Sequence, residues 1–284
     1  MAFRRFRRNK SGLAGLAIVA FFFFIAIFGY LFAPYPARSF QCLYQGCTDV
    51  PPFTNWAHPL GTENSGIDVY SEILHGTPND LYVGIVATVI AVAIGIVIGA
   101  LAGYRRGPSG ALLLGFTQMF LVLPLLIIIL LFARIFILAV ASGLGLTLIM
   151  LILGFFGWPT IALVARGEIL RIRELEFVQA SKALGASGRR ILFRHIVPNM
   201  LSPIIVLASL LVAGNILTEV VVSFLGFGDP NTSTWGLILE EGFGYVRTDW
   251  WISLFPGLAV VFCVLGFNLF GDGLSDALNP RLRE

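Results

Sequence analysis

Charged residues are scarce in this sequence. Of its 284 residues only 12% are Asp, Glu, Lys or Arg, whereas 57% are hydrophobic. A soluble domain carries about a quarter of its residues as charged ones. The chain instead contains repeated uncharged runs long enough to cross a bilayer, for which about 20 residues suffice. This shortage of charge excludes an ordinary soluble domain and predicts an all-α, polytopic membrane protein that uses the lipid bilayer as its solvent.

Residues that bind metals or carry out catalysis are also scarce. The chain has three cysteines and three histidines, with no CxxC pair, no His–Cys cluster and no spacing typical of a metal site. It has no GxxxxGK[ST] phosphate loop, so a partner must handle any ATP. An intramembrane enzyme would need reactive groups within its spans, and His58, His75 and His195 all lie outside them. We expect no catalytic site, no metal and no cofactor in this chain.

Apolar runs predict six transmembrane helices. Their bounds are 12–33, 80–104, 110–133, 143–165, 198–225 and 250–271. The first run is longer than the 7–15 apolar residues of a signal peptide, so we interpret it as an uncleaved span. The expected organisation is a tail and first span (1–33), an extracellular loop (34–79) and a membrane domain (80–284).

The basic residues indicate the topology. If the N-terminus is cytoplasmic, 16 of the 19 Lys and Arg residues fall in cytoplasmic segments. These are Arg4, Arg5, Arg7, Arg8, Lys10, Arg105, Arg106, Arg166, Arg171, Arg173, Lys182, Arg189, Arg190, Arg194, Arg281 and Arg283. The positive-inside rule therefore places both termini in the cytoplasm of a multi-pass protein in the cell membrane. Because the charges follow the membrane boundaries instead of forming one basic patch, no nucleic-acid partner is expected.

Three features within the predicted segments have structural consequences. Cys42 and Cys47 lie five positions apart in the outside loop, where a local disulfide would be stable; two unpaired thiols are the alternative. Gly95, Gly99 and Gly103 share one helix face, which lets a second helix approach closely. Pro124 lies in the middle of the third span and predicts a kink, because proline removes one backbone hydrogen bond.

Glu219 is interpreted as the one acidic residue within a predicted span. A carboxylate is costly in the bilayer, so it should face a cavity, a partner or the helix end. Asn215 lies four residues earlier on the same face. The two side chains are candidates for lining a pathway, and packing between subunits is the alternative.

The longest polar stretch, "EFVQASKALGASGRRILFRHIVPN" (176–199), lies between the fourth and fifth spans. Residues 174–184 favour a helix with Glu174 and Glu176 in its first turn, and Gly185 should end it. Phe177, Ala180 and Leu184 would form an apolar ridge along one face. Such a helix either docks into a groove on a partner or lies on the headgroups of the inner leaflet.

This stretch resembles the EAA loop of ABC importer membrane subunits. The pattern here is Gln179-Ala180-Ser181, Lys182-Ala183-Leu184, Gly185, and then Val197-Pro198, with Gln179 where an acid usually stands. The resemblance implies a cytoplasmic coupling helix, about 174–190, that docks into a groove on an ATPase subunit. The residues expected at this contact are Glu176, Phe177, Gln179, Ala180, Ser181, Lys182, Leu184 and Gly185.

Further motifs resemble the second permease of the dipeptide/oligopeptide/nickel importers. They are "HPLGTENSGIDV" (58–69), with Glu63 for the usual Asp and Ile67 where an Arg is common, "FRHIVPN" (193–199), "SFLGFG" (223–228), "WGLILEEG" (235–242) and "PGLAVVFCVLGFNLFGDGLSDALNPR" (256–281). This likeness implies a MetI-like permease fold and a subunit of an ATP-driven importer. The implied partners are a homologous second permease, two ABC ATPase subunits that bind ATP and Mg, and an external solute-binding protein.

The substrate is open at this point. Di- and oligopeptides are the first expectation from the resemblance, with an oligosaccharide or nickel as alternatives. A secondary transporter is the alternative from another class. It would often show inverted repeats or charged residues in the middle of the membrane, and the sequence shows no internal repeat.

Overall fold

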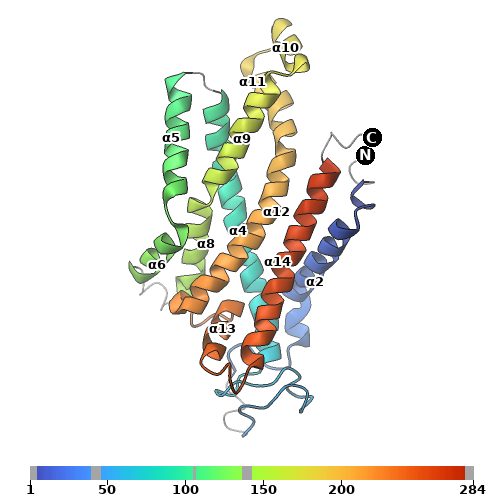
Figure 1. Ribbon diagram of the computed structural model, residues 1–284, viewed down its shortest axis with the longest axis vertical. Coiled ribbons are helices and arrows are strands. Elements are labelled where there is room, and N and C mark those ends of the chain that lie inside the picture. Colours follow the sequence, from blue (N-terminus) through green and yellow to red (C-terminus); the bar gives the residue numbers. More distant parts are fainter. Residues whose placement is uncertain (1–4, 40–45, 105–106, 136–142, 279–284) are drawn as a thin grey trace.

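The structure is a computed structural model that describes residues 5–39, 46–104, 107–135 and 143–278. Within these ranges the chain forms long helices along one axis (Figure 1). A single antiparallel bridge joins Thr62 to Asp68. The helices are α2 (Lys10–Phe32), α4 (Val69–Tyr104), α5 (Pro108–Val122), α6 (Leu125–Ile135), α8 (Gly145–Phe156), α9 (Trp158–Arg173), α10 (Glu176–Ala183), α11 (Gly188–Ile191), α12 (Val197–Val222), α13 (Trp235–Phe243) and α14 (Trp251–Leu278).

The six predicted spans are present in outline. Among the described residues, five helices are long and apolar enough to cross a membrane: Lys10–Phe32, Val69–Tyr104, Gly145–Arg173, Leu192–Phe227 and Trp251–Leu278. The bent pair α5–α6 makes a sixth if it is counted as one span. Most of the helices extend beyond the predicted bounds, because hydropathy marks the apolar part of a helix and not its polar ends.

The largest difference in bounds is at α4, which begins at Val69 and not at residue 80. The predicted loop 34–79 therefore ends in helix. Asp68 explains the early start, because its side chain accepts a hydrogen bond from the backbone N–H of Ser71 and caps the helix. The 36 residues of α4 measure about 54 Å, against about 30 Å for a hydrocarbon core. Helix α4 therefore extends past the apolar layer.

The predicted kink at Pro124 is confirmed and is severe. Helix α5 ends at Val122, α6 begins at Leu125, and their axes differ by 74°. Leu123 between them has an extended backbone. Extended geometry is what a residue before proline prefers, because the proline ring disfavours the helical conformation there. The third span is therefore broken rather than merely bent.

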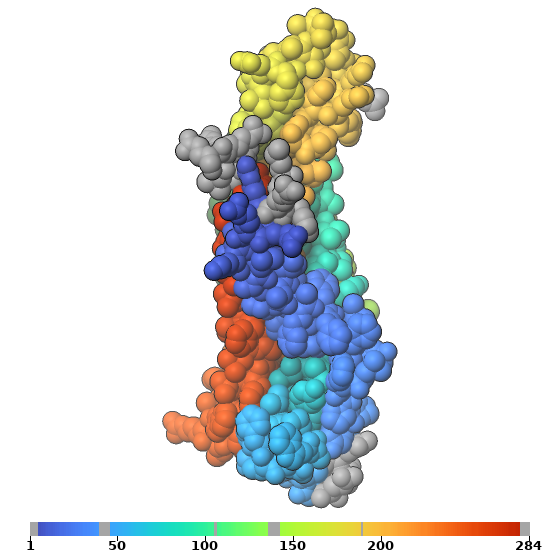
Figure 2. All heavy atoms as spheres, turned by 90° about the vertical axis from the view of Figure 1, so that its right-hand side faces the viewer, coloured from blue at the N-terminus to red at the C-terminus, as the bar shows by residue number. Residues whose placement is uncertain are grey.

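Glycines allow two helix pairs to approach closely. A Cβ on Gly95 would lie 2.5 Å from the Cβ of Ile161, and one on Gly99 would lie 2.5 Å from the carbonyl oxygen of Ala162. The predicted glycine face of α4 is confirmed, and its partner is α9. Helices α2 and α14 meet in the same way, since a Cβ on Gly12 would be 2.8 Å from the Cα of Gly273. Figure 2 shows α2 lying along α14.

The bundle has two distinct ends (Figure 1). We call the end with residues 46–68 and α13 the loop end, and the end with α10 and α11 the α10 end. Helix α2 begins and α14 ends toward the α10 end, where Asn9 Nδ2 donates to Asp276 Oδ2 (2.8 Å). Helix α13 was not predicted; it is a short helix capped by the Thr234 side chain.

The apolar core is divided along the bundle. One cluster, which includes Trp235 and Phe267, joins α2, α4, α12, α13 and α14. A second, with Ile169 and Met200, joins α9, α10 and α12 toward the α10 end. A third surrounds Ile149 between α4, α6 and α8. Each end of the molecule is thus supported by its own packing.

Candidate coupling site and the loop end

Helix α10 is the predicted coupling helix, and it spans Glu176–Ala183. Leu175 precedes it with an extended backbone, and Glu176 lies in its first turn. The prediction that Glu174 belongs to this first turn is wrong. Glu174 instead caps α9, because its backbone N–H donates to carbonyls in the last turn of that helix. The chain therefore turns sharply at Leu175 between two helices.

Gly185 ends α10, as the sequence predicted. Its φ is +82°, the left-handed region that favours glycine. The backbone N–H of Gly185 donates to the carbonyl of Lys182 (3.0 Å), and that of Ala186 donates to the carbonyl of Ser181 (3.1 Å). These two bonds form a Schellman motif, which satisfies carbonyls that the end of the helix leaves without partners.

The apolar side chains of α10 are largely uncovered. Val178 is the one buried residue of this helix, with 4% of its surface exposed. It packs in the second apolar cluster, with Ile169 and Met200. Phe177 is 45% exposed and Leu184 is 88% exposed, and Ala180 is also exposed. The helix projects at its end of the bundle (Figure 1). The predicted ridge of Phe177, Ala180 and Leu184 therefore has no cover within the described part of the chain.

Gln179 has a local role that an acidic side chain could not perform. Its Nε2 donates to the backbone carbonyl of Arg173 (3.0 Å), at the end of α9. A carboxylate accepts hydrogen bonds and cannot donate this one. The amide thereby ties α10 to α9 across the turn at Leu175. The remaining predicted contact residues, Glu176 and Lys182, are exposed, while Ser181 Oγ donates to the carbonyl of Phe177 (2.8 Å).

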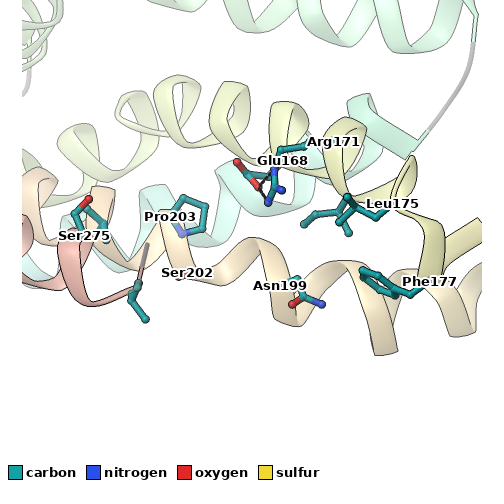
Figure 3. A pocket seen from close by; sticks show the side chains of 11 residues that line it. Glu168, Arg171, Leu175, Phe177, Asn199, Ser202, Pro203 and Ser275 are labelled. Atoms are coloured by element: carbon teal, nitrogen blue, oxygen red, sulfur yellow. Dashed lines mark hydrogen bonds and ion pairs between the residues drawn. The ribbon is translucent and has the colours of Figure 1, made fainter. Parts of the chain in front are cut away.

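A cavity of about 730 Å³ lies beside the base of α10. It is lined by Glu168, Arg171, Ile172, Leu175, Phe177, Asn199, Ser202, Pro203, Val206, Ser275 and Leu278. Figure 3 shows Glu168 and Arg171 on α9 across from Asn199 on α12. Arg171 donates to Glu168 Oε2 from both Nε (3.0 Å) and Nη2 (2.7 Å). This site was not predicted from the sequence, although Glu168 and Arg171, three residues apart at the end of a predicted span, were a visible signal.

Asn215 and Glu219, the predicted pathway candidates, are buried between helices. Asn215 Nδ2 donates to Thr88 Oγ1 of α4 (3.0 Å), and Glu219 accepts from Ser223 Oγ (2.6 Å). Glu219 is 0% exposed. These contacts all lie within the single chain, so packing between subunits, the alternative, also stays a prediction. A pathway role stays a prediction for the assembled transporter.

The interpretation of Glu219 as the one acidic residue within the spans is wrong. Asp80 of α4 is also fully buried, and its Oδ2 accepts from the backbone N–H of Trp235 at the start of α13 (3.1 Å). The carboxyl groups of Asp80 and Glu219 lie close enough to interact electrostatically. The two carboxyl groups join α4, α12 and α13. Asp80 was not recognised from the sequence because it is the first residue of the predicted span 80–104.

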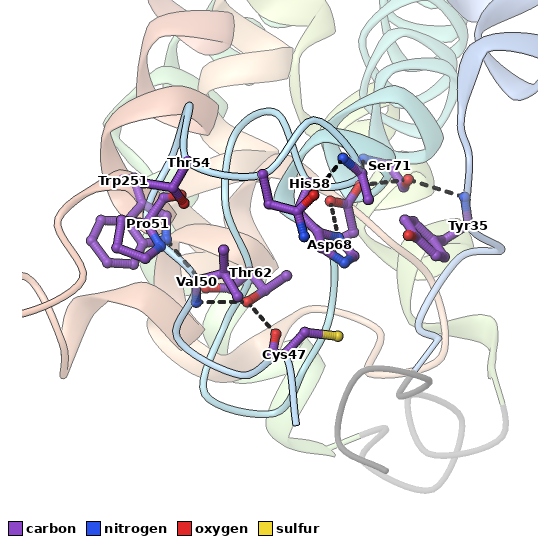
Figure 4. Close-up of polar contacts among 12 residues, drawn as sticks. Tyr35, Cys47, Val50, Pro51, Thr54, His58, Thr62, Asp68, Ser71 and Trp251 are labelled. Atoms are coloured by element: carbon purple, nitrogen blue, oxygen red, sulfur yellow. Dashed lines mark hydrogen bonds and ion pairs between the residues drawn. The ribbon is translucent and has the colours of Figure 1, made fainter. Parts of the chain in front are cut away.

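At the loop end, the motif "HPLGTENSGIDV" forms a buried polar network. Asp68 Oδ1 lies 3.0 Å from His58 Nδ1, and Asp68 Oδ2 accepts from both the backbone N–H (2.8 Å) and Oγ (2.7 Å) of Ser71. The Tyr35 ring stacks on His58 with centroids 4.9 Å apart. Figure 4 shows these groups gathered at the start of α4. Because the Ser71 hydroxyl donates to Asp68 and not to His58, the arrangement is a helix cap and not a nucleophile–base pair.

Thr62 and Gly61 attach the loop to α14. Thr62 Oγ1 donates to the carbonyl of Cys47 (2.8 Å) and accepts from the backbone N–H of Val50 (3.0 Å). Trp251 Nε1 donates to the carbonyl of Thr62 (3.1 Å; Figure 4). Gly61 has a φ of +86°, and a Cβ there would lie 2.6 Å from the carbonyl oxygen of Val50. Only glycine fits this position.

Three acidic side chains and one arginine form a second polar group in this region. Arg38 Nη1 pairs with Glu241 Oε1 (2.7 Å), and the backbone N–H of Arg38 donates to Glu72 Oε1. Glu63 accepts from Ser65 Oγ (3.0 Å), whereas its Oε1 is buried without a hydrogen-bond partner among the described residues. Burial, followed by the charge of Glu241, raises the pKa of Glu63 to about 8. Burial also raises the pKa of Glu241, and Arg38 opposes that increase.

The predicted disulfide is only partly within the described residues. Cys47 is disulfide-bonded, whereas Cys42 lies outside the described residues. Cys263 is a free, buried thiol in α14. The pairing of Cys42 with Cys47 stays a prediction.

Comparisons with known proteins agree with this architecture. Residues 95–284 match the family described as binding-protein-dependent transport system inner membrane component. Residues 1–46 match the N-terminal transmembrane domain of oligopeptide transport permease C. The chain is 34% identical to the dipeptide transport system permease protein DppC of Bacillus subtilis, over all of this chain and 86% of that protein. It is 33% identical to the oligopeptide transport system permease protein OppC of the same organism, over all of this chain and 90% of that one.

A third relative carries a different name. The glutathione transport system permease protein GsiD of Pectobacterium atrosepticum is 31% identical over 99% of this chain and 90% of that protein. The chain belongs to the family of binding-protein-dependent transport system inner membrane components. It is a multi-pass membrane permease of the kind found in ABC importers, and its family is a transport family and not a catalytic one.

Proposed function

We propose that this chain is the second permease subunit of an ATP-driven importer of di- or oligopeptides. It forms the translocation path together with a homologous permease. Two ATPase subunits bind ATP and Mg on the cytoplasmic side, and a solute-binding protein delivers the substrate from outside. The exposed helix α10 carries this proposal, because Phe177 and Leu184 present apolar surface that the described chain leaves uncovered.

The position of α10 supports a mechanical role. It follows α9 after a single turn at Leu175, and the chain continues through α11 and the π-helical segment Leu192–Ile196 into α12. Gln179 holds α10 to the end of α9. Because helices are stiff, a displacement of α10 by an ATPase subunit would tilt α9 and α12. Movement of these two helices would switch the path between inward and outward access.

The distribution of charge supports the proposed orientation. Lys182 and Arg190 are exposed at the α10 end, and basic residues concentrate in cytoplasmic segments under the positive-inside rule. With the α10 end in the cytoplasm, both termini lie there too. The loop end then faces outward, toward the solute-binding protein.

The peptide substrate is supported by the names of three relatives, which transport dipeptides, oligopeptides and glutathione. Oligosaccharide and nickel were the alternatives from the sequence. Neither appears in the names of these three relatives. We therefore propose a short peptide as the cargo.

The test is uptake by the complete importer in proteoliposomes. A radiolabelled peptide supplied outside with the solute-binding protein should accumulate only when ATP is supplied on the ATPase side. An ATPase subunit should also co-purify with the permease. Uptake that continues without ATP would identify a secondary transporter and overturn the proposal. ATP-driven uptake of a sugar or of nickel, but not of peptide, would overturn the substrate alone.

A further inference from the structure

The cavity beside α10 is not explained by docking to an ATPase. Its volume of about 730 Å³ lies within the range of about 300–1,000 Å³ for small-molecule sites. Its walls come from α9, α12 and α14, and Leu175 and Phe177 close it at the base of α10. In Figure 3 the Phe177 end and the Ser275 end lie at opposite sides of the space. The cavity is therefore elongated between the coupling helix and the last span.

The lining of the cavity is suited to a zwitterion. Glu168 and Arg171 present opposite charges on the same wall, 2.7 Å apart. The Arg171 side chain is 58% exposed, so a ligand carboxylate can reach it without a large desolvation cost. Asn199 and Ser202 also line the space from α12, and one N–H of the Asn199 amide donates to the carbonyl of His195 (2.7 Å). Amides and hydroxyls can donate to or accept from a peptide backbone.

The same wall disfavours a simple anion. Glu168 accepts hydrogen bonds from both Nε and Nη2 of Arg171, so an anion would displace a carboxylate and then lie beside it. A zwitterion has no net charge, so its carboxylate can pair with Arg171 while its ammonium group offsets the charge of Glu168. Pro203 and Val206 provide apolar contact for its side chains.

We propose that this cavity binds a short zwitterionic peptide from the cytoplasmic side, and that its occupancy slows the transporter by restraining α10. The inference rests on the proposed function, since that function supplies both the peptide and the orientation. A ligand can shift an equilibrium only as far as its affinity differs between the two states. Phe177 provides this difference, because it belongs to α10 and also forms part of the cavity wall.

The weak attachment of α10 makes such control effective. Within the helix only Val178 is buried, so few contacts oppose its movement. A peptide that spans from Arg171 to Phe177 would add contacts between α9 and α10 in one of the two positions of α10, and would favour that position. A high concentration of peptide inside the cell would then lower ATP hydrolysis. Import would slow as the imported peptide accumulates.

The experiment uses the complete importer in proteoliposomes with the ATPase subunits facing the bath. Trialanine added to the bath should lower ATP hydrolysis at least twofold, whereas N-acetyl-trialanine amide, which lacks both charges, should not. The S202F variant places a phenyl ring in the cavity and should abolish the inhibition. I205F places the same ring on the exposed face of the same helix, outside the cavity, and should retain the inhibition. Each rate is compared with the rate of the same variant without peptide.

If S202F does not assemble with its partners, a second variant tests the same site. Arg171→Gln removes the group that meets the peptide carboxylate and should raise the inhibitory concentration about tenfold, with partial recovery in Arg171→Lys. Equal inhibition by trialanine and its capped form would overturn the zwitterion assignment. Unchanged inhibition in both S202F and Arg171→Gln would overturn the site. ATP hydrolysis that changes with the anionic phospholipid content of the vesicles, but not with the concentration of trialanine, would assign the cavity to lipid and overturn the proposal.

A separate measurement distinguishes this inference from the proposed function. Trialanine binding to the intact importer in detergent without ATP, measured by calorimetry, should be lost in S202F. If external peptide is imported with ATP but no binding or inhibition is seen, this inference fails and the proposed function stands. If no peptide is imported while trialanine still binds at the cavity, the proposed function fails independently.

Discussion

Each end of the molecule has a capped helix, but the two ends differ in the kind of cap and in burial. At the loop end, Asp68 caps α4 and is itself buried together with His58. At the α10 end, Gly185 caps a helix whose outer side chains are exposed. The loop end is therefore held by its own hydrogen bonds, and α10 is held mainly by its connections. Regions with few buried contacts are the ones that open or move at low cost in free energy.

The comparison separates stability from coupling. Substitutions at the loop end should change the free energy of unfolding, because they break buried bonds. Substitutions on the exposed side of α10 should change transport with little effect on folding. Four measurements test this separation, from the largest expected effect to the smallest.

Asp68→Ala should have the largest effect on stability. It removes the cap of α4 and leaves His58 and Ser71 without this buried acceptor. Loss of a cap costs about 0.5–2 kcal/mol, and each buried group left unpaired costs about 1–3 kcal/mol. We expect a total of about 2–4 kcal/mol, measured as a lower unfolding midpoint in detergent. Asp68→Asn keeps an acceptor oxygen and should lose less, and equal losses in the two variants would contradict the assignment.

Glu63→Gln should remove part of the pH dependence of stability. Its pKa in the folded protein is raised to about 8, from the ordinary value of 4.5, chiefly by burial. Between those values the folded state retains a proton that the unfolded state releases, so stability falls as the pH rises from about 4.5 to about 8. The melting temperature of the natural protein should therefore fall across this window more steeply than that of the variant. Parallel curves would show that Glu63 does not titrate there.

Gly185→Ala should weaken the end of α10 without a steric clash. Its φ is +82°, and no atom lies within 4 Å of the added Cβ. The left-handed conformation costs a non-glycine residue about 1–2 kcal/mol. We expect reduced substrate-stimulated ATP hydrolysis with normal membrane insertion. Gly167→Ala is the matched control, since its surroundings are equally open and it has no positive φ. Full coupling in Gly185→Ala would count against the assigned role of this turn.

Leu184→Ser should have the smallest effect on stability. The side chain is 88% exposed, so the free energy of unfolding should change by less than about 0.5 kcal/mol. The amount of ATPase subunit retained by the permease on co-purification should nevertheless fall. Trp56→Ser is the control, because Trp56 is equally exposed at the loop end. It should leave this retention unchanged, and an equal loss in both variants would remove the distinction between the two ends.

Much of this fold could be predicted from local patterns. Apolar runs located the spans, Gly95 and Gly99 indicated a close helix contact, and Pro124 and Gly185 marked a break and an end. Each of these depends on the properties of one residue or of one helix face. Helix α10 was located in the same way, although its first residue was predicted two positions too early.

Other features depended on distant residues. Asp80 and Glu219 are separated by well over a hundred positions, and nothing in either local pattern pairs them. Helix α13 and the cap at Asp68 were missed because turn and loop composition obscured the helix signals. The cavity is lined by residues of three separate helices, and neither hydropathy nor spacing predicts how these helices pack.

The sequence by itself determined that this is a membrane protein with about six spans, a basic side and an exposed polar segment. Hydrophobicity and backbone preference are properties of the residues themselves, so they can be read without coordinates. The tertiary structure alone decided which polar groups meet, which side chains of α10 stay uncovered and where a cavity remains. These depend on how separate helices pack, and packing is a property of the whole chain.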